Sequence, residues 1–120
     1  MDEPKKKLFS RRDDVTLANP FGPPARGWDQ VEKTMERAAS QLREGEATGF
    51  ERISEYAEAD LAYILEIERT REKVGGADEM SRVSLRVTTI FRREDDRWRI
   101  VHRHADPITS PRPIESVVEQ

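Results

Sequence analysis

The sequence contains no cysteine, only two histidines and no long apolar run. Without cysteine there are no disulfides, no thiolate metal ligands and no cysteine nucleophile. No apolar segment is long enough to span a membrane, and the N-terminus lacks the apolar stretch of a signal peptide, so we expect a cytoplasmic protein with no membrane partner. The 21 basic and 24 acidic side chains nearly balance, and nucleic acid is not an expected partner. Short basic runs at 5–7 and 11–12 are typical of solvated surface.

The apolar pattern is sufficient for one domain, which we expect to span 1–107, followed by a proline-containing tail at 108–120. A helix is predicted over 28–42, because Val31, Met35, Ala38 and Leu42 recur with helical spacing. Strands are predicted at 15–18, 50–59, 60–73, 81–93 and 98–106. The prolines and glycines at 21–27 predict an irregular loop before the helix.

The last two strands fit a tight hairpin with Asp95 and Asp96 in its turn. The predicted register pairs Glu94 with Arg97, Phe91 with Ile100, Thr89 with His102, and Val87 with His104. Strict alternation would direct a row of five side chains inward from the final strand: Trp98, Ile100, His102, His104 and Asp106. In the strand at 60–73 the alternation predicts that Glu66 and Glu68 point away from any pocket, opposite Tyr63.

Two segments carry a resemblance to known families. Asp13-Asp14-Val15-Thr16-Leu17-Ala18-Asn19-Pro20-Phe21-Gly22, with Arg26-Gly27-Trp28-Asp29-Gln30-Val31, resembles ketosteroid isomerases. Residues 85–106, which end in Trp98-Arg99-Ile100-Val101-His102-Arg103-His104-Ala105-Asp106, resemble the closing hairpin of SnoaL-like domains of the nuclear transport factor 2-like superfamily. The resemblance implies an α+β cone, in which a curved antiparallel sheet of four to five strands wraps one main helix.

Only a remnant of the superfamily's first helix precedes Asp13. Two explanations are open: a start further upstream in the gene, or a partner subunit that covers the exposed sheet. An uncovered apolar sheet face is unusual for a monomer, so we expect a homodimer.

The resemblance also shows departures at the isomerase's catalytic positions. Asn19 stands where those enzymes carry their aspartate base, and an amide cannot accept that proton at neutral pH. Thr89 stands where they carry a second, neutral aspartic acid, and the helix that bears their oxyanion tyrosine is missing. Steroid isomerisation by the familiar mechanism is therefore not expected.

The candidate catalytic residues are His102, His104 and Asp106, which alternate along one strand. Three interpretations are open for them: hydrogen bonds that only fix packing, ligand contact with acid–base chemistry, or a metal site. The candidate ligand-binding residues are Asn19, Trp28, Tyr63 and Thr89. Each has a structural alternative: Asn19 before proline commonly starts a turn, and the two aromatic residues commonly lie in the core.

The leading hypothesis is a SnoaL-like pocket protein that takes a small, mostly apolar carbonyl compound. Such a protein, as an enzyme, would isomerise, cyclise or dehydrate its ligand by proton transfer without an organic cofactor. One alternative is a non-catalytic ligand-binding or dimerisation module. Another is a metal-assisted hydrolase or lyase that uses both histidines.

Overall fold

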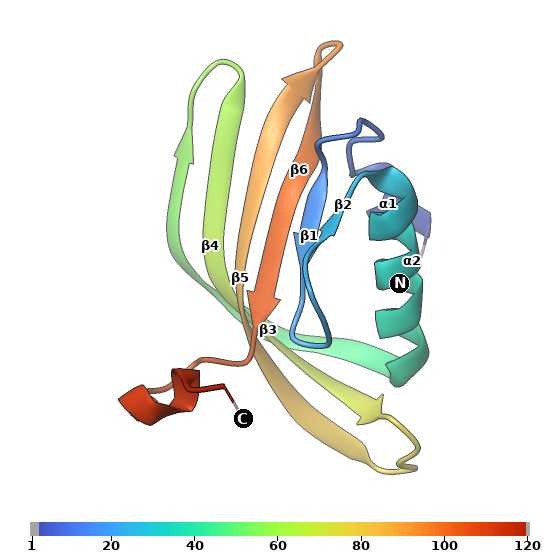
Figure 1. Ribbon diagram of the computed structural model, residues 1–120, viewed down its shortest axis with the longest axis vertical. Coiled ribbons are helices and arrows are strands. Elements are labelled where there is room, and N and C mark those ends of the chain that lie inside the picture. Colours follow the sequence, from blue (N-terminus) through green and yellow to red (C-terminus); the bar gives the residue numbers. More distant parts are fainter. Residues whose placement is uncertain (1–2, 120) are drawn as a thin grey trace.

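The computed structural model describes residues 3–119, in which six strands form a single curved sheet beside one long helix (Figure 1). The elements are α1 (Glu3–Lys7), β1 (Thr16–Ala18), β2 (Ala25–Arg26), α2 (Trp28–Gln41), β3 (Leu42–Ala57), β4 (Leu61–Val74), β5 (Met80–Glu94), β6 (Arg97–Asp106) and a 3₁₀ turn, η1 (Ile114–Val117). The strand order is β2-β1-β6-β5-β4-β3.

The α+β cone and most of the element positions are confirmed, with two corrections to the sheet. It has six strands where four to five were expected, because the loop after β1 returns as the short strand β2. It is also mixed, since β1 runs parallel to β6 while the other pairs are antiparallel. In addition, β3 begins at Leu42, directly after the helix, where the sequence predicted a start at Phe50.

Helix α2 forms because its apolar residues recur on one face, which packs against the sheet. Val31 and Met35 are fully buried there, together with Val15 and Leu17 from the segment around β1. Ile100 of β6 joins the same core, so the core lies between α2, β1 and the first half of β6.

The β5–β6 hairpin is confirmed near its turn. Asp95 and Asp96 both have positive φ, at 51° and 65°, as a two-residue type I′ turn requires. Glu94 pairs with Arg97, and Phe91 pairs with Ile100, as the sequence predicted.

Beyond Ile100 the predicted register is wrong, because a β-bulge leaves Val101 as an extra residue in β6. The observed pairs are Ile90 with His102, Thr89 with Arg103, Thr88 with His104, and Val87 with Ala105. A one-residue slip exchanges the two faces of a strand. Arg103 and Ala105 therefore face α2, while His102, His104 and Asp106 lie on the outer face of the sheet.

The orientation predicted for β4 is also wrong. Glu66 pairs with the fully buried Val87, and Glu68 pairs with Leu85, so both carboxylates lie on the face toward α2. Each is matched by an arginine: Arg52 lies 3.2 Å from Glu66, and Arg103 lies 2.8 Å from Glu68. The apolar row of β4 that contains Tyr63 occupies the outer face.

The segment after β6 leads away from the sheet (Figure 1). Its 3₁₀ turn exposes Ile114 and Val117, each to 77%. Within residues 3–119, no helix has the length and apolar character that crossing a membrane requires.

Candidate functional site

A cavity of about 170 Å³ lies between the second half of α2 and the inner face of the sheet. Its apolar wall consists of Leu17, Pro20, Phe21, Met35, Ala38, Ala39, Leu42, Leu85 and Ala105. Its polar lining comes from Lys5, Asn19, Glu68, Thr70, Glu72 and Arg103. A mostly apolar cavity with a few converging polar groups is the usual form of a small-molecule site.

Arg103 is the central polar group of this cavity. The bulge in β6 turns it inward, between Leu17 of β1 and Thr89 of β5. Its Nη2 donates to Glu68 Oε1 at 2.8 Å, and its side chain is only 20% exposed. A guanidinium has five N–H donors, and this one makes no other hydrogen bond to the described residues, so donors stay available to a ligand.

Glu72 supplies a second carboxylate to the cavity and, unlike Glu68, is not paired with an arginine of the described residues. Its Oε2 accepts a hydrogen bond from Thr70 Oγ1 at 3.0 Å, and no cation of residues 3–119 lies within ion-pair distance of it. A Cβ atom at Gly45 would lie 2.6 Å from Glu72 Oε1, so the glycine makes room for this carboxylate. Glu72 is therefore a half-buried acceptor without a charge partner in the described part of the chain.

Asn19 lies at the edge of the cavity, as one of its two interpretations predicted. Its Oδ1 accepts the Phe21 backbone N–H at 3.0 Å, which is the turn-forming bond that the other interpretation predicted. The two are compatible, because the bond occupies the oxygen and leaves the amide NH₂ group to contact a ligand.

A family model for the SnoaL-like domain matches residues 6–109. The chain belongs to this family. A search of curated proteins finds no significant match.

Solved structures show the same fold. A ketosteroid isomerase-like protein from Erwinia carotovora atroseptica is 15% identical, with a TM-score of 0.72 over 88% of this chain and 79% of the other. A proposed dehydratase of the NTF2-like family from Streptomyces avermitilis is 16% identical, with a TM-score of 0.73 over 90% and 84%. A proposed calcium/calmodulin-dependent protein kinase type II association domain from Thiobacillus denitrificans is 26% identical, with a TM-score of 0.61 over 85% and 78%.

In this SnoaL-like domain the remaining ligand-binding candidates lie outside the cavity. Thr89 is buried on the inner face opposite Arg103 but does not line the cavity. Trp28 packs near Phe9 at the start of α2, with the Arg11 guanidinium 3.7 Å above its ring. Tyr63 lies on the outer face and stacks with Tyr56, so it cannot reach a ligand in the cavity.

The two histidines and Asp106 share one face of β6, as predicted, but it is the face opposite the cavity. Thr16 Oγ1 lies 2.7 Å from His102 Nδ1, and His104 Nε2 lies 2.9 Å from Asp106 Oδ2. Arg86 Nη2 also donates to Asp106 Oδ2 at 2.8 Å. His104, Arg86 and Asp106 therefore form an outer-face network, while His102 bonds separately to Thr16, and none of these side chains lines the cavity.

The pKa values of His102 and Asp106 follow from their surroundings. Burial, reinforced by the nearby His104, lowers the pKa of His102 and favours its neutral ring. Burial would raise the pKa of Asp106, but hydrogen bonds from Arg86 and from the Ile108 backbone outweigh it, so Asp106 stays ionised. Within the described residues no three His, Asp or Glu side chains are arranged to hold a metal ion, so the metal-assisted alternative has no ligand set there.

Sequence reasoning missed Arg103, Glu68 and Glu72 as lining residues of the cavity. The ion pair joins Glu68 of β4 to Arg103 of β6, two strands that are separated by β5. The predicted face of both side chains was wrong. Strict alternation from Ile100 places Arg103 on the outer face, and the same rule in β4 placed Glu68 opposite Tyr63, away from the cavity. The available signal was the row Glu66, Glu68, Thr70 and Glu72, which shares one face of a strand and needs a cation opposite it.

Proposed function

We propose that this SnoaL-like domain binds a small, mostly apolar carbonyl compound in the cavity beside α2. The half-buried Arg103 guanidinium carries the proposal, because it places unused hydrogen-bond donors in a mostly apolar site. An engineered cavity of about 150 Å³ holds one benzene molecule. The observed cavity of about 170 Å³ thus favours a ligand with one enclosed ring and disfavours a steroid.

The chemistry that fits this site is proton transfer beside the carbonyl group. Arg103 donates to the carbonyl oxygen and stabilises negative charge that develops there. Glu72 accepts the proton from the neighbouring carbon, because Glu68 is already engaged with Arg103. Isomerisation and dehydration both begin with such a step, and neither requires an organic cofactor.

Binding is tested by NMR titration of the ¹⁵N-labelled protein with cyclohexanone. We expect shifts confined to residues around the cavity, and Arg103→Met weakens binding about tenfold, equivalent to about 1.4 kcal/mol. Arg86→Met is the matched control, since Arg86 also pairs with a carboxylate but lies on the outer face. Shifts absent from the cavity, or an equal effect of the two substitutions, would contradict the proposal.

Proton transfer is tested by following deuterium uptake beside the cyclohexanone carbonyl in D₂O. We expect the wild-type protein to accelerate uptake over buffer, and Glu72→Gln to remove the acceleration while cyclohexanone still binds. Binding without any accelerated uptake would instead support the non-catalytic ligand-binding module.

A further inference from the structure

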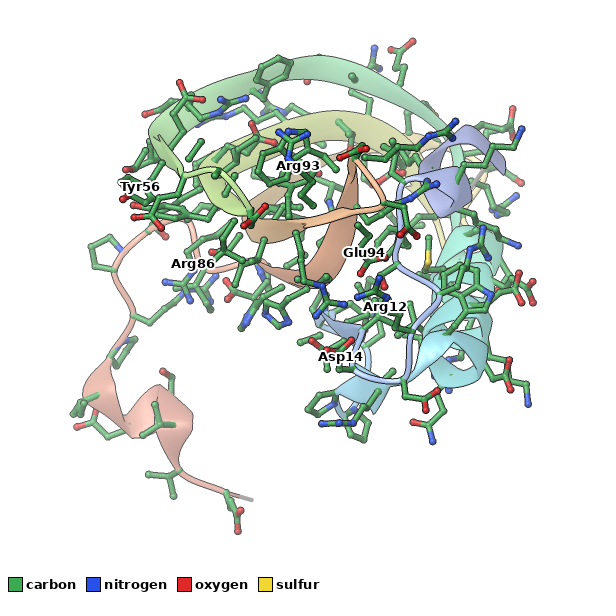
Figure 2. All side chains as sticks on the ribbon, turned by 90° about the horizontal axis from the view of Figure 1, so that it is seen from above. Arg12, Asp14, Tyr56, Arg86, Arg93 and Glu94 are labelled. Carbon is green, nitrogen blue, oxygen red and sulfur yellow. The ribbon has the colours of Figure 1, made fainter. Side chains whose placement is uncertain are left out.

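A second hollow lies at the other end of β6, where the N-terminal segment meets the turn of the β5–β6 hairpin. It is an open groove of about 650 Å³, which we call the basic groove. Its lining residues are Lys7, Phe9, Arg11, Arg12, Glu94, Asp95, Arg97 and Arg99. Figure 2 shows Arg12 and Glu94 close together at this end of the molecule.

Backbone pairing brings these residues together from distant parts of the sequence. Phe9 forms a parallel bridge with Ile100, in which the Ser10 N–H donates to the Ile100 carbonyl at 2.8 Å. The Ile100 N–H donates in turn to the Leu8 carbonyl at 2.7 Å. Lys7 and the arginine pair at 11–12 therefore lie beside the start of β6, which contributes Arg97 and Arg99.

Glu94 does not neutralise this groove. Its carboxylate is buried and already binds Arg92 at 2.6 Å and Ser10 Oγ at 2.8 Å, whereas Arg12 approaches only to 3.7 Å. Burial would raise the pKa of Glu94, but the bonds from Arg92 and Ser10 outweigh it, so the carboxylate stays charged. Arg92 also binds Asp14, at 2.7 Å. The two cations Arg92 and Arg12 therefore balance the two carboxylates of Glu94 and Asp14, and Arg12 adds no net charge to the groove.

Four cations then remain against one acid. Lys7, Arg11, Arg97 and Arg99 line the groove, and among the side chains of residues 5–119 no carboxylate lies within ion-pair distance of any of them. The remaining acid is Asp95 in the turn. The whole chain has a net charge of −3, so this surplus of positive charge is local and not a product of general basicity.

We propose that the basic groove binds a small ligand through a multiply charged phosphoryl group. A single carboxylate would offset one of three surplus positive charges, whereas a diphosphate offsets most of them. Guanidinium groups also match phosphate oxygens with paired, parallel hydrogen bonds, and three of the four unpaired cations are arginines. The groove is open to solvent and has room for the rest of such a ligand.

The test is a calorimetric titration with inorganic pyrophosphate at constant ionic strength. We expect saturable 1:1 binding, and Arg97→Gln weakens it about tenfold, which corresponds to the loss of one charge-assisted contact. Arg82→Gln is the matched control, because Arg82 is exposed near the far end of β5 and loses the same charge. Lys7→Gln is a second groove variant, so that a folding defect in one of them does not decide the outcome.

Several results would overturn the proposal. Equal weakening by Arg82→Gln would show that only overall charge matters, and equal affinity for citrate would show that the groove does not select phosphoryl groups. Binding to anionic vesicles or single-stranded DNA without binding to pyrophosphate would assign the groove to a macromolecule. The proposal is independent of the carbonyl-compound site proposed in the cavity beside α2, since Arg103→Met is expected to leave pyrophosphate binding unchanged within twofold.

Discussion

At the scale of single residues, His102 links the outer face to pH. Its ring lies against Thr16 of β1, and burial with the nearby His104 lowers its pKa below the ordinary 6.5. In the unfolded chain the ring takes up a proton near pH 6.5, before the folded protein does. Unfolding therefore binds protons in the window just below pH 6.5, and stability must fall as the pH is lowered through it.

This prediction is checked by urea unfolding at several pH values between 5 and 7.5. We expect the urea concentration at the wild-type unfolding midpoint to decrease as the pH is lowered below 6.5. His102→Gln should show a smaller decrease, because the titrating ring is gone. His104→Gln keeps the His102–Thr16 contact and the burial that is the larger cause of the lowered pKa, so its decrease should lie between those of the wild type and His102→Gln. A pH dependence that is the same in wild type and His102→Gln would show that His102 does not titrate differently on folding.

At the scale of elements, the structure shows what local pattern could predict. The Asp95-Asp96 turn and the first pairs of the hairpin were predictable, because turn geometry and side-chain pairing both act over a few residues. The bulge that leaves Val101 as an extra residue was not predictable, because strict alternation fits the sequence on either side of it. The parallel partner strand β1, which sets Leu17 opposite Arg103, comes from a remote part of the chain.

Strand β4 shows a second limit, of a different physical kind. Alternation correctly separated its apolar row from its acidic row, yet the assumption that apolar side chains face the helix was wrong. The inner face tolerates Glu66 and Glu68 because arginines neutralise them across the sheet. The cavity was thus predictable in outline, while its polar groups depended on charge pairing between strands distant in sequence.

Helix α2 begins at a glycine that the backbone requires. Gly27 has φ of 84°, and its N–H donates to the Val15 carbonyl at 2.8 Å. We expect Gly27→Ala to lower the free energy of unfolding by about 1 kcal/mol or more, because residues that carry a side chain rarely adopt this backbone conformation. The control is Gly22→Ala, where no atom lies within 4 Å of the added methyl group. Equal stability of the two variants in urea unfolding would contradict the strain argument.

At the scale of the whole molecule, the outer face of the sheet shows which surface a second copy would cover. Tyr56 is 53% exposed and Tyr63 is 37% exposed, and they form a shallow apolar hollow with Ile90. Arg86 and Asp106, which lie on this face, are already paired with each other. A face of apolar side chains and satisfied charges can meet its own copy without leaving a buried charge unpaired.

We therefore expect a homodimer that associates through this outer face. Sedimentation velocity should show a dimer for the wild type, and Tyr63→Lys should shift it to monomer, because two lysines would enter the apolar centre of a symmetric interface. Leu8→Lys is the matched control, since Leu8 is 50% exposed but lies in the N-terminal segment. Circular dichroism establishes that each variant folds. A wild type that stays monomeric at 100 μM would refute the prediction, whereas a dimer that persists in Tyr63→Lys would place the interface elsewhere, because a lysine ammonium cannot be buried there without a large loss of solvation.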